Sequence, residues 1–271
     1  MTPAEIEAAA DALFAAERDR RQIGLLSLAH PTMTLDAAYA VQAALVRRKE
    51  VSGRRRIGWK IGLTSRAVQQ ALKIDTPDSG VLFDDMLFPD RGTVPPGRFI
   101  QPRVEAEIAF ILSAGLAGEH VTRSEVLAAT EAVAPALEIL DTRILRADPA
   151  SGRLRSVVDT VADNAANAGL VLGPQRHDPA AVDLRRVGAI VKCNGVVEET
   201  GLGAGVLDDP VAGVLWLVRR LARYGQGLSA GEVVLSGSFI RPIEAPPGCR
   251  IEADFGAFGA VAVDFGAGVD G

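Results

Sequence analysis

Cysteine and histidine are scarce in this sequence. Its 271 residues include two cysteines, Cys193 and Cys249, which are far apart, and three histidines, His30, His120 and His177. No CxxC pair and no HExxH motif occurs, so neither a disulfide framework nor a thiolate or protease zinc site is expected. The GKS and GKT signatures of a phosphate-binding loop are missing as well. These absences exclude the commonest zinc and nucleotide-phosphate sites.

An excess of positive charge and long apolar runs are missing too. Lys and Arg number 29 against 34 Asp and Glu, which gives a formal net charge of −5 and a pI near 5.4. A nucleic-acid-binding protein normally carries a basic excess, so no nucleic-acid partner is expected. No apolar run is long enough for a membrane span, and the acidic N-terminus lacks the basic start and apolar core of a signal peptide. We therefore expect a cytoplasmic protein that does not enter a membrane.

The composition that is present is ordinary for a globular protein, with 48% apolar and 23% charged residues. Residues 1–55 have a helical pattern. A capping box with proline at the first helical position predicts a helix after Thr2. A second helix is predicted over residues 34–53, where a glycine provides the stop signal. The first 55 residues therefore form a predicted helical segment.

From residue 56 onward, short apolar runs alternate with glycine, proline and aspartate clusters, which is typical of β-strands. Asn194 and Gly195 between two such runs predict a two-residue hairpin. The pattern indicates an α+β fold, with the helical segment packed on a β-rich domain of residues 56–271 as one structural unit. Helices are predicted at 65–72, 123–130 and 209–223. Strands are predicted at 57–62, 81–83, 103–112, 133–140, 169–172, 187–193, 196–200, 232–236, 250–255 and 259–264.

Three glutamates are the main candidates for chemistry. Glu105 and Glu107 are two residues apart in the predicted strand 103–112, so they share one face while the opposite face is apolar. Glu138 lies within an apolar run, where an unpaired acid is seldom buried. Three acids together repel one another unless a cation lies between them, and an all-oxygen site suits Mg²⁺ or Mn²⁺. From spacing alone, the solvated face of an amphipathic strand remains an open alternative.

Lys60 and Asp78 are candidates for acid–base catalysis. Lys60 lies in an apolar, glycine-flanked strand, where burial is expected to lower the pKa of its amine. The alternative is a lysine whose amine reaches solvent. For Asp78 the alternative is an ordinary turn residue. Asp163 and Asn164 are candidates for substrate binding, and the alternative for both is a role in turns and helix caps.

The sequence resembles the 2-oxopent-4-enoate hydratase branch of the fumarylacetoacetate hydrolase superfamily. Six segments follow one another in the family's order: GWKIGLTSRAVQ, TPDSGVLFDDM, PRVEAEIAF, APALEILDTR, DTVADNAANAG and NGVVEETGLGAGVL. The resemblance implies a helical N-terminal part and a C-terminal mixed β domain with a bent, barrel-like β core. It also implies that Glu105, Glu107 and Glu138 bind Mg²⁺ or Mn²⁺. Lys60 and Asp78 match positions with acid–base or substrate-orienting roles.

The resemblance further implies a hydratase that adds water to a 2-hydroxy-2,4-dienoate in aromatic catabolism. The segment GSFIRP at 237–242 favours a seven-carbon dicarboxylate, 2-oxohept-4-ene-1,7-dioate, and Arg241 is the candidate for binding its distal carboxylate. Ser79 departs from the family, because relatives often carry tyrosine there, and this leaves the pocket wall beside Asp78 open. Family members are usually homo-oligomers, so a homo-oligomer is expected, with a pathway decarboxylase as a further partner of the chain.

Four alternatives stay open at this point. The substrate can be the five-carbon 2-oxopent-4-enoate, the reaction can be that of a 4-oxalocrotonate decarboxylase, or the chain can be a non-catalytic partner subunit. The fourth alternative, a hydrolase of acylpyruvates, needs a His–Glu pair near the metal. All three histidines lie outside the segments that carry the resemblance, which disfavours that hydrolase.

Overall fold

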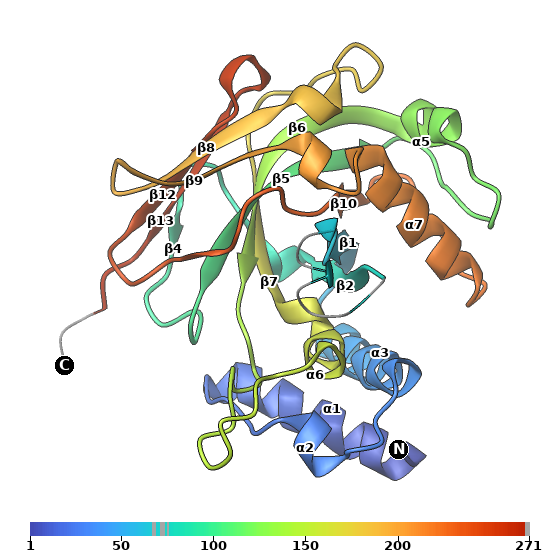
Figure 1. The fold of residues 1–271 in the computed structure, drawn as a ribbon, viewed down its shortest axis with the longest axis vertical. Helices are drawn as coiled ribbons and strands as arrows, with labels where there is room; N and C mark the ends of the chain where they lie inside the picture. Colours follow the sequence, from blue (N-terminus) through green and yellow to red (C-terminus); the bar gives the residue numbers. More distant parts are fainter. Residues whose placement is uncertain (67–68, 71–73, 75, 269–271) are drawn as a thin grey trace.

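Two β-sheets and a layer of helices make up the described part of the chain, residues 1–66, 69–70, 74 and 76–268 of a computed structural model. In Figure 1 the N-terminal helices lie below the larger sheet, and the smaller sheet lies at the upper left. The helices are α1 (Pro3–Asp19), α2 (Leu26–Ala29), α3 (Leu35–Val51), α5 (Arg123–Ala129), α6 (Val157–Ala162) and α7 (Pro210–Ala222). The strands are β1 (Arg56–Gly62), β2 (Asp78–Phe83), β3 (Leu87–Phe88), β4 (Thr93–Val94), β5 (Arg103–Leu112), β6 (Thr130–Leu140), β7 (Asn167–Leu172), β8 (Gly188–Cys193), β9 (Val196–Leu202), β10 (Val233–Leu235), β11 (Ile243–Glu244), β12 (Arg250–Asp254) and β13 (Ala260–Phe265).

The long helices begin at the residues that their capping signals predict. The Thr2 hydroxyl accepts from the Glu5 backbone N–H, and the Glu5 carboxylate accepts from the Thr2 N–H, which completes a capping box on α1. The Thr34 hydroxyl caps α3. The Asp209 carboxylate caps α7, whose first residue is a proline. Each of these side chains satisfies a backbone donor that the helix leaves free.

The larger sheet has the order β2-β1-β10-β5-β6-β7-β3, and β11 adds to β5. Most neighbours are antiparallel, while β1–β10 and β3–β7 are parallel. The sheet curls into a half-barrel around the centre of Figure 1, with β5 and β6 as its longest strands. This curl confirms the bent, barrel-like core, and it brings strands that are not neighbours to face one another.

The side chain of Asn164 completes the edge strand β2. Its Oδ1 accepts from the Val81 N–H at 2.8 Å, and its Nδ2 donates to the Val81 carbonyl at 2.9 Å. An amide side chain thus satisfies the edge groups that a neighbouring strand would otherwise bind. Glycine is needed at position 80, because a Cβ there would collide with the Asn164 carbonyl oxygen. The segment that contains Asn164 is therefore held directly against β2.

The smaller sheet has the order β4-β13-β12-β8-β9. Cys193 of β8 lies opposite Val196 of β9, so two residues form the connecting turn. Both have positive φ angles, 50° for Asn194 and 82° for Gly195, as a type I′ turn requires. The predicted hairpin is confirmed, and β9 forms one edge of this sheet.

The N-terminal helices share their hydrophobic cluster with residues from the middle of the chain. Apolar side chains of α1 and α3 pack with Ile144 and with Val161 and Ala162 of α6. A second and larger cluster lies among the two sheets, α5 and α7. Residues on both sides of the predicted boundary at residue 55 therefore build the helical part.

The predicted strands are confirmed within a few residues, as are the helices at 34–53, 123–130 and 209–223. The short elements α2, α6, β3, β4 and β11 were not predicted, because two to six residues are too few to show a period. Half of the helix predicted at 65–72 lies outside the described residues. Among the described residues, no helix combines the length and the apolarity that crossing a bilayer requires.

Candidate active site

Strands β5 and β6 bring three glutamates together. Glu105 and Glu138 are directly opposite each other in the register of the two strands, and Glu107 lies two residues along the same face of β5. One carboxylate oxygen of each residue lies within 4.8 Å of the other two. Like charges that face each other across a strand pair destabilise a sheet. The cluster therefore needs protons or a cation to offset the repulsion.

Burial makes the charged form of these carboxylates unfavourable. Glu107 and Glu138 are fully buried, and Glu105 lines a cavity. Burial and the neighbouring Glu138 raise the pKa of Glu105 to about 8. Burial, Glu138 and Glu105 likewise raise the pKa of Glu107 well above its ordinary value. The alternative of a solvated strand face is therefore wrong.

Two carboxylate oxygens of the cluster have no hydrogen-bond partner among the described residues. These are Glu107 Oε1 and Glu138 Oε2, and both atoms are buried. The other oxygen of each of these two residues is held, because Glu107 Oε2 accepts from the Gly237 N–H at 2.8 Å and Glu138 Oε1 accepts from Asn167 Nδ2 at 3.0 Å. A carboxylate with one oxygen fixed and the other free is oriented as a metal ligand is. An all-oxygen donor set of this kind fits Mg²⁺ or Mn²⁺.

Lys60 reaches the glutamates from β1. Since β10 and β5 separate β1 from β6, the two strands would lie about 14 Å apart in a flat sheet, and the curl brings them closer. Lys60 Nζ lies 3.2 Å from Glu138 Oε1 and donates to the Ala165 carbonyl at 3.1 Å. Burial lowers the pKa of the amine, but Glu138, Asp78 and the other glutamates outweigh burial and raise it. The predicted lowering of this pKa is therefore wrong, because the sequence shows the apolar neighbours and not the converging acids.

Asp78 begins β2 and faces the same cavity as Lys60. It lies opposite Gly62 of β1, where a Cβ would collide with Asp78 Oδ1 and crowd Lys60 Nζ. Glycine at position 62 thus lets the carboxylate and the amine approach each other. Asp78 Oδ1 is buried without a hydrogen-bond partner among the described residues. Burial raises the pKa of Asp78, although Lys60 and the Gly62 N–H oppose the shift.

A run of left-handed residues provides two supports of the site. Residues 164–166 have φ angles of 51°, 53° and 60°. This conformation costs about 1–2 kcal/mol for each residue other than glycine, so the surrounding contacts have to hold it. The run directs the Ala165 carbonyl to Lys60, and Asn167, which follows directly, binds Glu138.

Arg143 and Asp163 fix this run from the other side. Arg143 is almost fully buried; its Nε donates to Asp163 Oδ1 at 2.6 Å and its Nη1 donates to the Asn167 carbonyl at 3.0 Å. Asp163 and Asn164 are absent from the described wall of the cavity, and their side chains are bound to Arg143 and to β2. These contacts indicate a supporting role for both side chains, and the substrate-binding role expected for them stays a prediction. Sequence reasoning missed Arg143 and Asn167, although both lie in segments that carry the family resemblance.

A cavity of about 890 Å³ opens beside the glutamates. The charged residues in its wall are Lys60, Asp78, Arg103, Glu105, Arg155, Glu199 and Arg241. The Arg241 side chain is 83% exposed, and its Nε donates to Glu199 Oε1 at 2.7 Å. Arg241 is thus at the cavity as expected, but it already has a carboxylate partner from β9.

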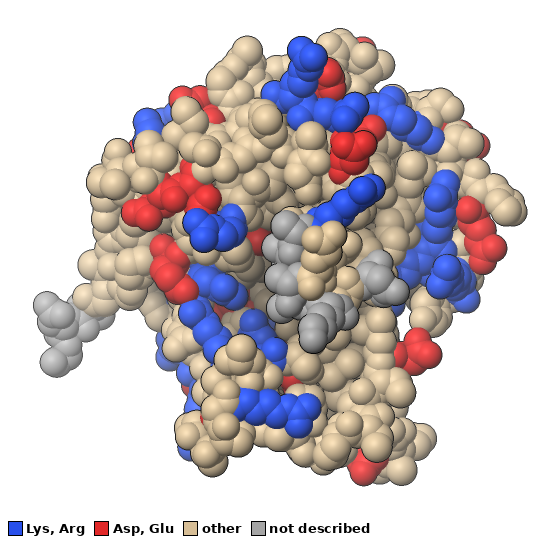
Figure 2. Space-filling model, in the orientation of Figure 1, with Lys and Arg blue, Asp and Glu red and all other residues tan. Residues whose placement is uncertain are grey.

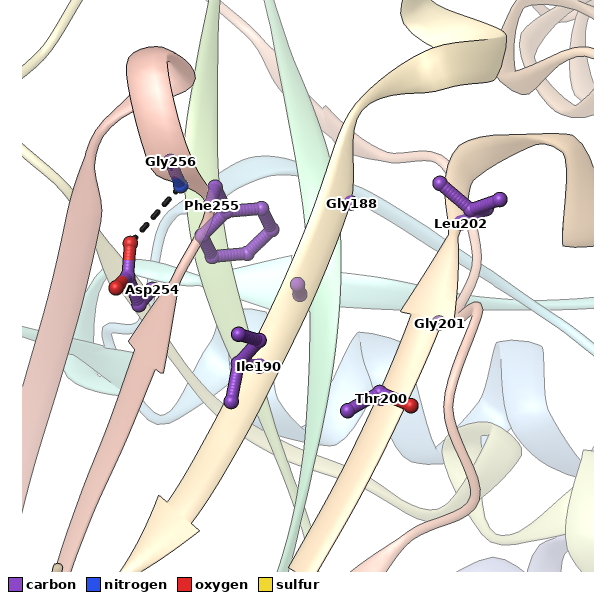
Figure 3. Close-up of a pocket in the computed structure, with 9 residues that line it drawn as sticks. Gly188, Ile190, Thr200, Gly201, Leu202, Asp254, Phe255 and Gly256 are labelled. Carbon is purple, nitrogen blue, oxygen red and sulfur yellow. Dashed lines mark hydrogen bonds between the residues drawn. The ribbon is translucent and has the colours of Figure 1, made fainter. Parts of the chain in front are cut away.

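A second hollow, of about 640 Å³, lies on the smaller sheet and offers little chemistry. Figure 3 shows it between β8 and β9, with the segment that follows β12 at one side. Asp254 is the one acidic residue in its described lining, and its Oδ1 accepts from the Gly256 N–H at 2.9 Å. None of the three histidines lines either hollow. Lys60, Asp78 and Glu105 line the larger cavity, and the buried Glu107 and Glu138 adjoin Glu105.

Solved structures share this fold. The 4-oxalocrotonate decarboxylase from Pseudomonas putida G7, complexed with magnesium and adipate, matches with a TM-score of 0.91 and 33% identity over 98% of each chain. Fumarylacetoacetate hydrolase from Exiguobacterium antarcticum matches more distantly, with a TM-score of 0.58 and 15% identity over 79% of this chain and 76% of the other. The fold is that of the fumarylacetoacetate hydrolase superfamily.

Two curated relatives narrow the class. The 2-oxo-hept-4-ene-1,7-dioate hydratase of Escherichia coli is 46% identical over 256 residues, which are 94% of this chain and 96% of the relative. The 2-keto-4-pentenoate hydratase of Paraburkholderia xenovorans (strain LB400) is 42% identical over 265 residues, 98% of this chain and 96% of the relative. No family model matches the chain. The chain belongs to the 2-keto-4-pentenoate hydratase family, whose members named as hydratases are hydro-lyases.

Proposed function

We propose that this protein is a divalent-metal-dependent hydratase that converts 2-oxohept-4-ene-1,7-dioate to 4-hydroxy-2-oxoheptane-1,7-dioate. The observation that carries the proposal is the convergence of Glu105, Glu107 and Glu138 beside Lys60 and Asp78 at one cavity. The identity of 46% to a hydratase of this seven-carbon dicarboxylate supports the choice of substrate.

Glu105, Glu107 and Glu138 are the residues that we propose as ligands of Mg²⁺ or Mn²⁺. The buried oxygens of Glu107 and Glu138 that have no partner among the described residues, and the raised pKa of Glu105 and Glu107, support this assignment. A divalent ion held there supplies a Lewis acid for the 2-oxo group of the substrate. The Gly237 N–H and the Asn167 amide orient two of the three carboxylates from behind.

Lys60 and Asp78 are the groups that we propose for proton transfer. The reacting form is the dienol tautomer of the 2-oxo-4-ene acid, in which a proton has moved from C3 to the 2-oxo oxygen. In the first step its 2-hydroxyl loses a proton and C5 gains one, which gives a 2-oxo acid with a double bond between C3 and C4. In the second step water adds at C4, loses a proton, and C3 gains one. The Lys60 amine lines the cavity and lies 3.2 Å from Glu138 Oε1, so it can donate a proton to a substrate bound beside the glutamates. Asp78 has one buried free oxygen in the same cavity and can accept a proton.

A turnover assay tests this proposal. The purified protein is given the seven-carbon and the five-carbon dienoate, with Mg²⁺ or with EDTA, and the products are identified by mass. We expect the addition of one water, faster with the dicarboxylate, and loss of activity with EDTA or in Glu107→Gln. A control variant, Glu131→Gln, changes an exposed acid of β6 and should keep full activity. No metal-dependent product from either dienoate would show the function to be wrong.

Decarboxylation is the second candidate reaction. The match to the decarboxylase from P. putida G7, with a TM-score of 0.91, is the observation that favours it. Such an enzyme binds a 2-oxo acid in the same way and releases CO₂ instead of adding water. Mass analysis of the products from 4-oxalocrotonate separates the two reactions, because hydration leaves all carbons in the product.

We also propose that the protein is a homo-oligomer, as the family resemblance implies. Four apolar side chains on β8 and the edge strand β9 are between 44% and 63% exposed: Ile190, Val196, Val197 and Leu202. An exposed apolar edge strand is prone to association, and such patches often mark interfaces. These residues support an interface between copies of the chain at this edge.

A further inference from the structure

Two arginines in the wall of the larger cavity have no acidic partner among the described residues. Of the four basic side chains in the described part of the wall, Lys60 and Arg241 are each paired with a glutamate. Arg103, the first residue of β5, and Arg155, just before α6, are not. Figure 2 shows basic side chains gathered on this face between the β-rich part and the helices, with acidic ones among them. The cavity thus has two cations that are available to an anionic ligand.

The acidic groups around these arginines are already bound. Glu244, whose charge acts on Arg103, is held by Arg146 at 2.8 Å. Asp163, whose charge acts on Arg155, is held by a buried arginine at 2.6 Å. Glu105 also acts on Arg103 but belongs to the proposed metal-binding cluster, so neither arginine has an ion-pair partner of its own among the described residues.

Arg155 shows the need for a ligand most clearly. Its Nη1 is buried and has no hydrogen-bond partner among the described residues. A buried donor without a partner destabilises the fold, because its hydrogen bond to water is lost on folding and no hydrogen bond within the protein replaces it. Burial lowers the pKa of this guanidinium, and nearby Arg103 lowers it further. An anion in the cavity would offset both costs.

The position of Arg103 on β5 sets its distance from the three glutamates that we propose as metal ligands. Arg103 and Glu105 are two residues apart on the same face of β5, so about 6.7 Å separates them along the strand. In a fully extended chain each carbon–carbon bond of about 1.5 Å advances by about 1.3 Å, because of the bond angles, so the ends of a seven-carbon chain are at most about 8 Å apart. A dicarboxylate that has its 2-oxo acid end at the glutamates can therefore place its other end at Arg103.

We propose that Arg103 and Arg155 bind the distal carboxylate of the substrate and thereby select dicarboxylates over monocarboxylates. This inference rests on the proposed function, because it uses the substrate orientation set by the glutamates. Guanidinium groups suit the task, since each offers paired donors that match the two oxygens of a carboxylate. Arg241 is assigned instead to its pair with Glu199 at the exposed side of the cavity.

Binding of two unreactive ligands tests the inference without turnover. Isothermal titration calorimetry on the Mg²⁺-loaded protein compares 2-oxopimelate, a seven-carbon dicarboxylate, with 2-oxopentanoate, a monocarboxylate. We expect Arg155→Gln and Arg103→Gln to weaken binding of 2-oxopimelate by about 100-fold, as for loss of a charged hydrogen-bonded pair. Binding of 2-oxopentanoate should stay within about twofold. The control Arg186→Gln changes an exposed arginine outside the lining of the cavity and should change neither ligand. Arg241→Gln is measured alongside as the rival binder of the distal carboxylate.

Several outcomes would overturn the inference. Equal affinity of the wild-type protein for the two ligands, equal loss for both ligands in the variants, or a selective loss in Arg241→Gln alone would each do so. If Arg155→Gln does not fold, Arg155→Lys replaces it and should show a smaller loss, still confined to 2-oxopimelate. Selective binding through these arginines in a protein that hydrates neither dienoate would leave the inference standing and overturn the proposed function.

Discussion

Glu138 is the residue at which the parts of the site meet. It lies opposite Glu105 in the sheet, contacts Lys60 at 3.2 Å and accepts from Asn167 at 3.0 Å. Lys60 therefore offsets part of the repulsion within the cluster, in addition to its proposed proton transfer. A change of Lys60 separates these two roles, because only the second is needed in each turnover.

We expect Lys60→Met to lower kcat by about 10²–10⁴-fold, the usual contribution of a general acid or base. Binding of Mn²⁺ should persist or tighten, because the variant removes a positive charge 3.2 Å from Glu138. Steady-state kinetics and calorimetric titration with Mn²⁺ measure the two effects. The control Lys192→Met changes a lysine on β8, outside the lining of the cavity. Activity within tenfold of the wild type, or loss of Mn²⁺ binding, would contradict the proposed role.

At the scale of residues, the sequence was sufficient where spacing decides the outcome. Glu105 and Glu107 share a face because strand side chains alternate, and this holds whatever the partners are. The pKa direction of Lys60 could not be predicted, since it depends on acids from three other strands. The contacts of Asp163 and Asn164 could not be predicted either, because their partners are distant in the chain. Asp163 binds Arg143, and Asn164 binds Val81 of β2.

Helices α1 and α3 are joined by a buried charge cluster. Glu17 lies 2.6 Å from both Lys49 Nζ and Arg54 Nη1, and the Lys49 side chain is almost completely buried. Burial raises the pKa of Glu17, but Lys49, Arg143 and Arg54 outweigh burial and hold the pKa well below its ordinary range. The fold therefore depends on Glu17 being ionised.

We expect Glu17→Gln to lower the free energy of unfolding by about 3–5 kcal/mol at neutral pH, because it leaves Lys49 buried without its carboxylate. A carboxyl group whose pKa is lowered on folding stabilises the fold at pH values above its ordinary pKa, which is about 4.3 for glutamate. That contribution is lost as the pH falls from there through the pKa of the group in the folded protein. The difference between wild type and variant should thus shrink below about pH 4. Urea unfolding between pH 3 and about 7 measures it.

Glu7→Gln is the matched control for this prediction. Glu7 also links α1 to α3, through Arg47 and Arg48, but half of its side chain is exposed. Exposed pairs contribute about 0–1 kcal/mol, so this variant should stay close to the wild type. Equal losses in the two variants, or a Glu17→Gln effect that is independent of pH, would contradict the argument from burial.

At the scale of elements, local sequence signals were enough to predict where helices and turns begin and end. They were not enough to predict the contacts that form when the larger sheet curls. Capping at Thr2 and the Asn194-Gly195 turn follow from rules that involve a few neighbouring residues. The left-handed run at 164–166 could not be expected, because two of its residues are alanines, which disfavour positive φ. That run is stable only because β2, Arg143 and Lys60 bind it, and these contacts arise when the sheet closes.

For the whole molecule, the edge of the smaller sheet leads to a prediction about assembly. We expect light scattering after gel filtration to give a mass of two or more chains. Val197→Asp places a charge on β9 at a side chain that is 53% exposed, so it should reduce that mass without unfolding the chain. The control Glu198→Gln alters the neighbouring residue and should leave the mass unchanged. A single-chain mass for the wild-type protein would contradict the proposed homo-oligomer.

The helical cluster also has a consequence for the order of synthesis. The apolar faces of α1 and α3 are completed by Ile144, Val161 and Ala162, which leave the ribosome long after these helices have been made. At about 5–20 residues per second, the gap of roughly a hundred residues corresponds to about 5–20 s. During that time the part of the apolar surface of α1 and α3 that these later residues cover stays exposed, so this is the period in which chaperones have most to bind.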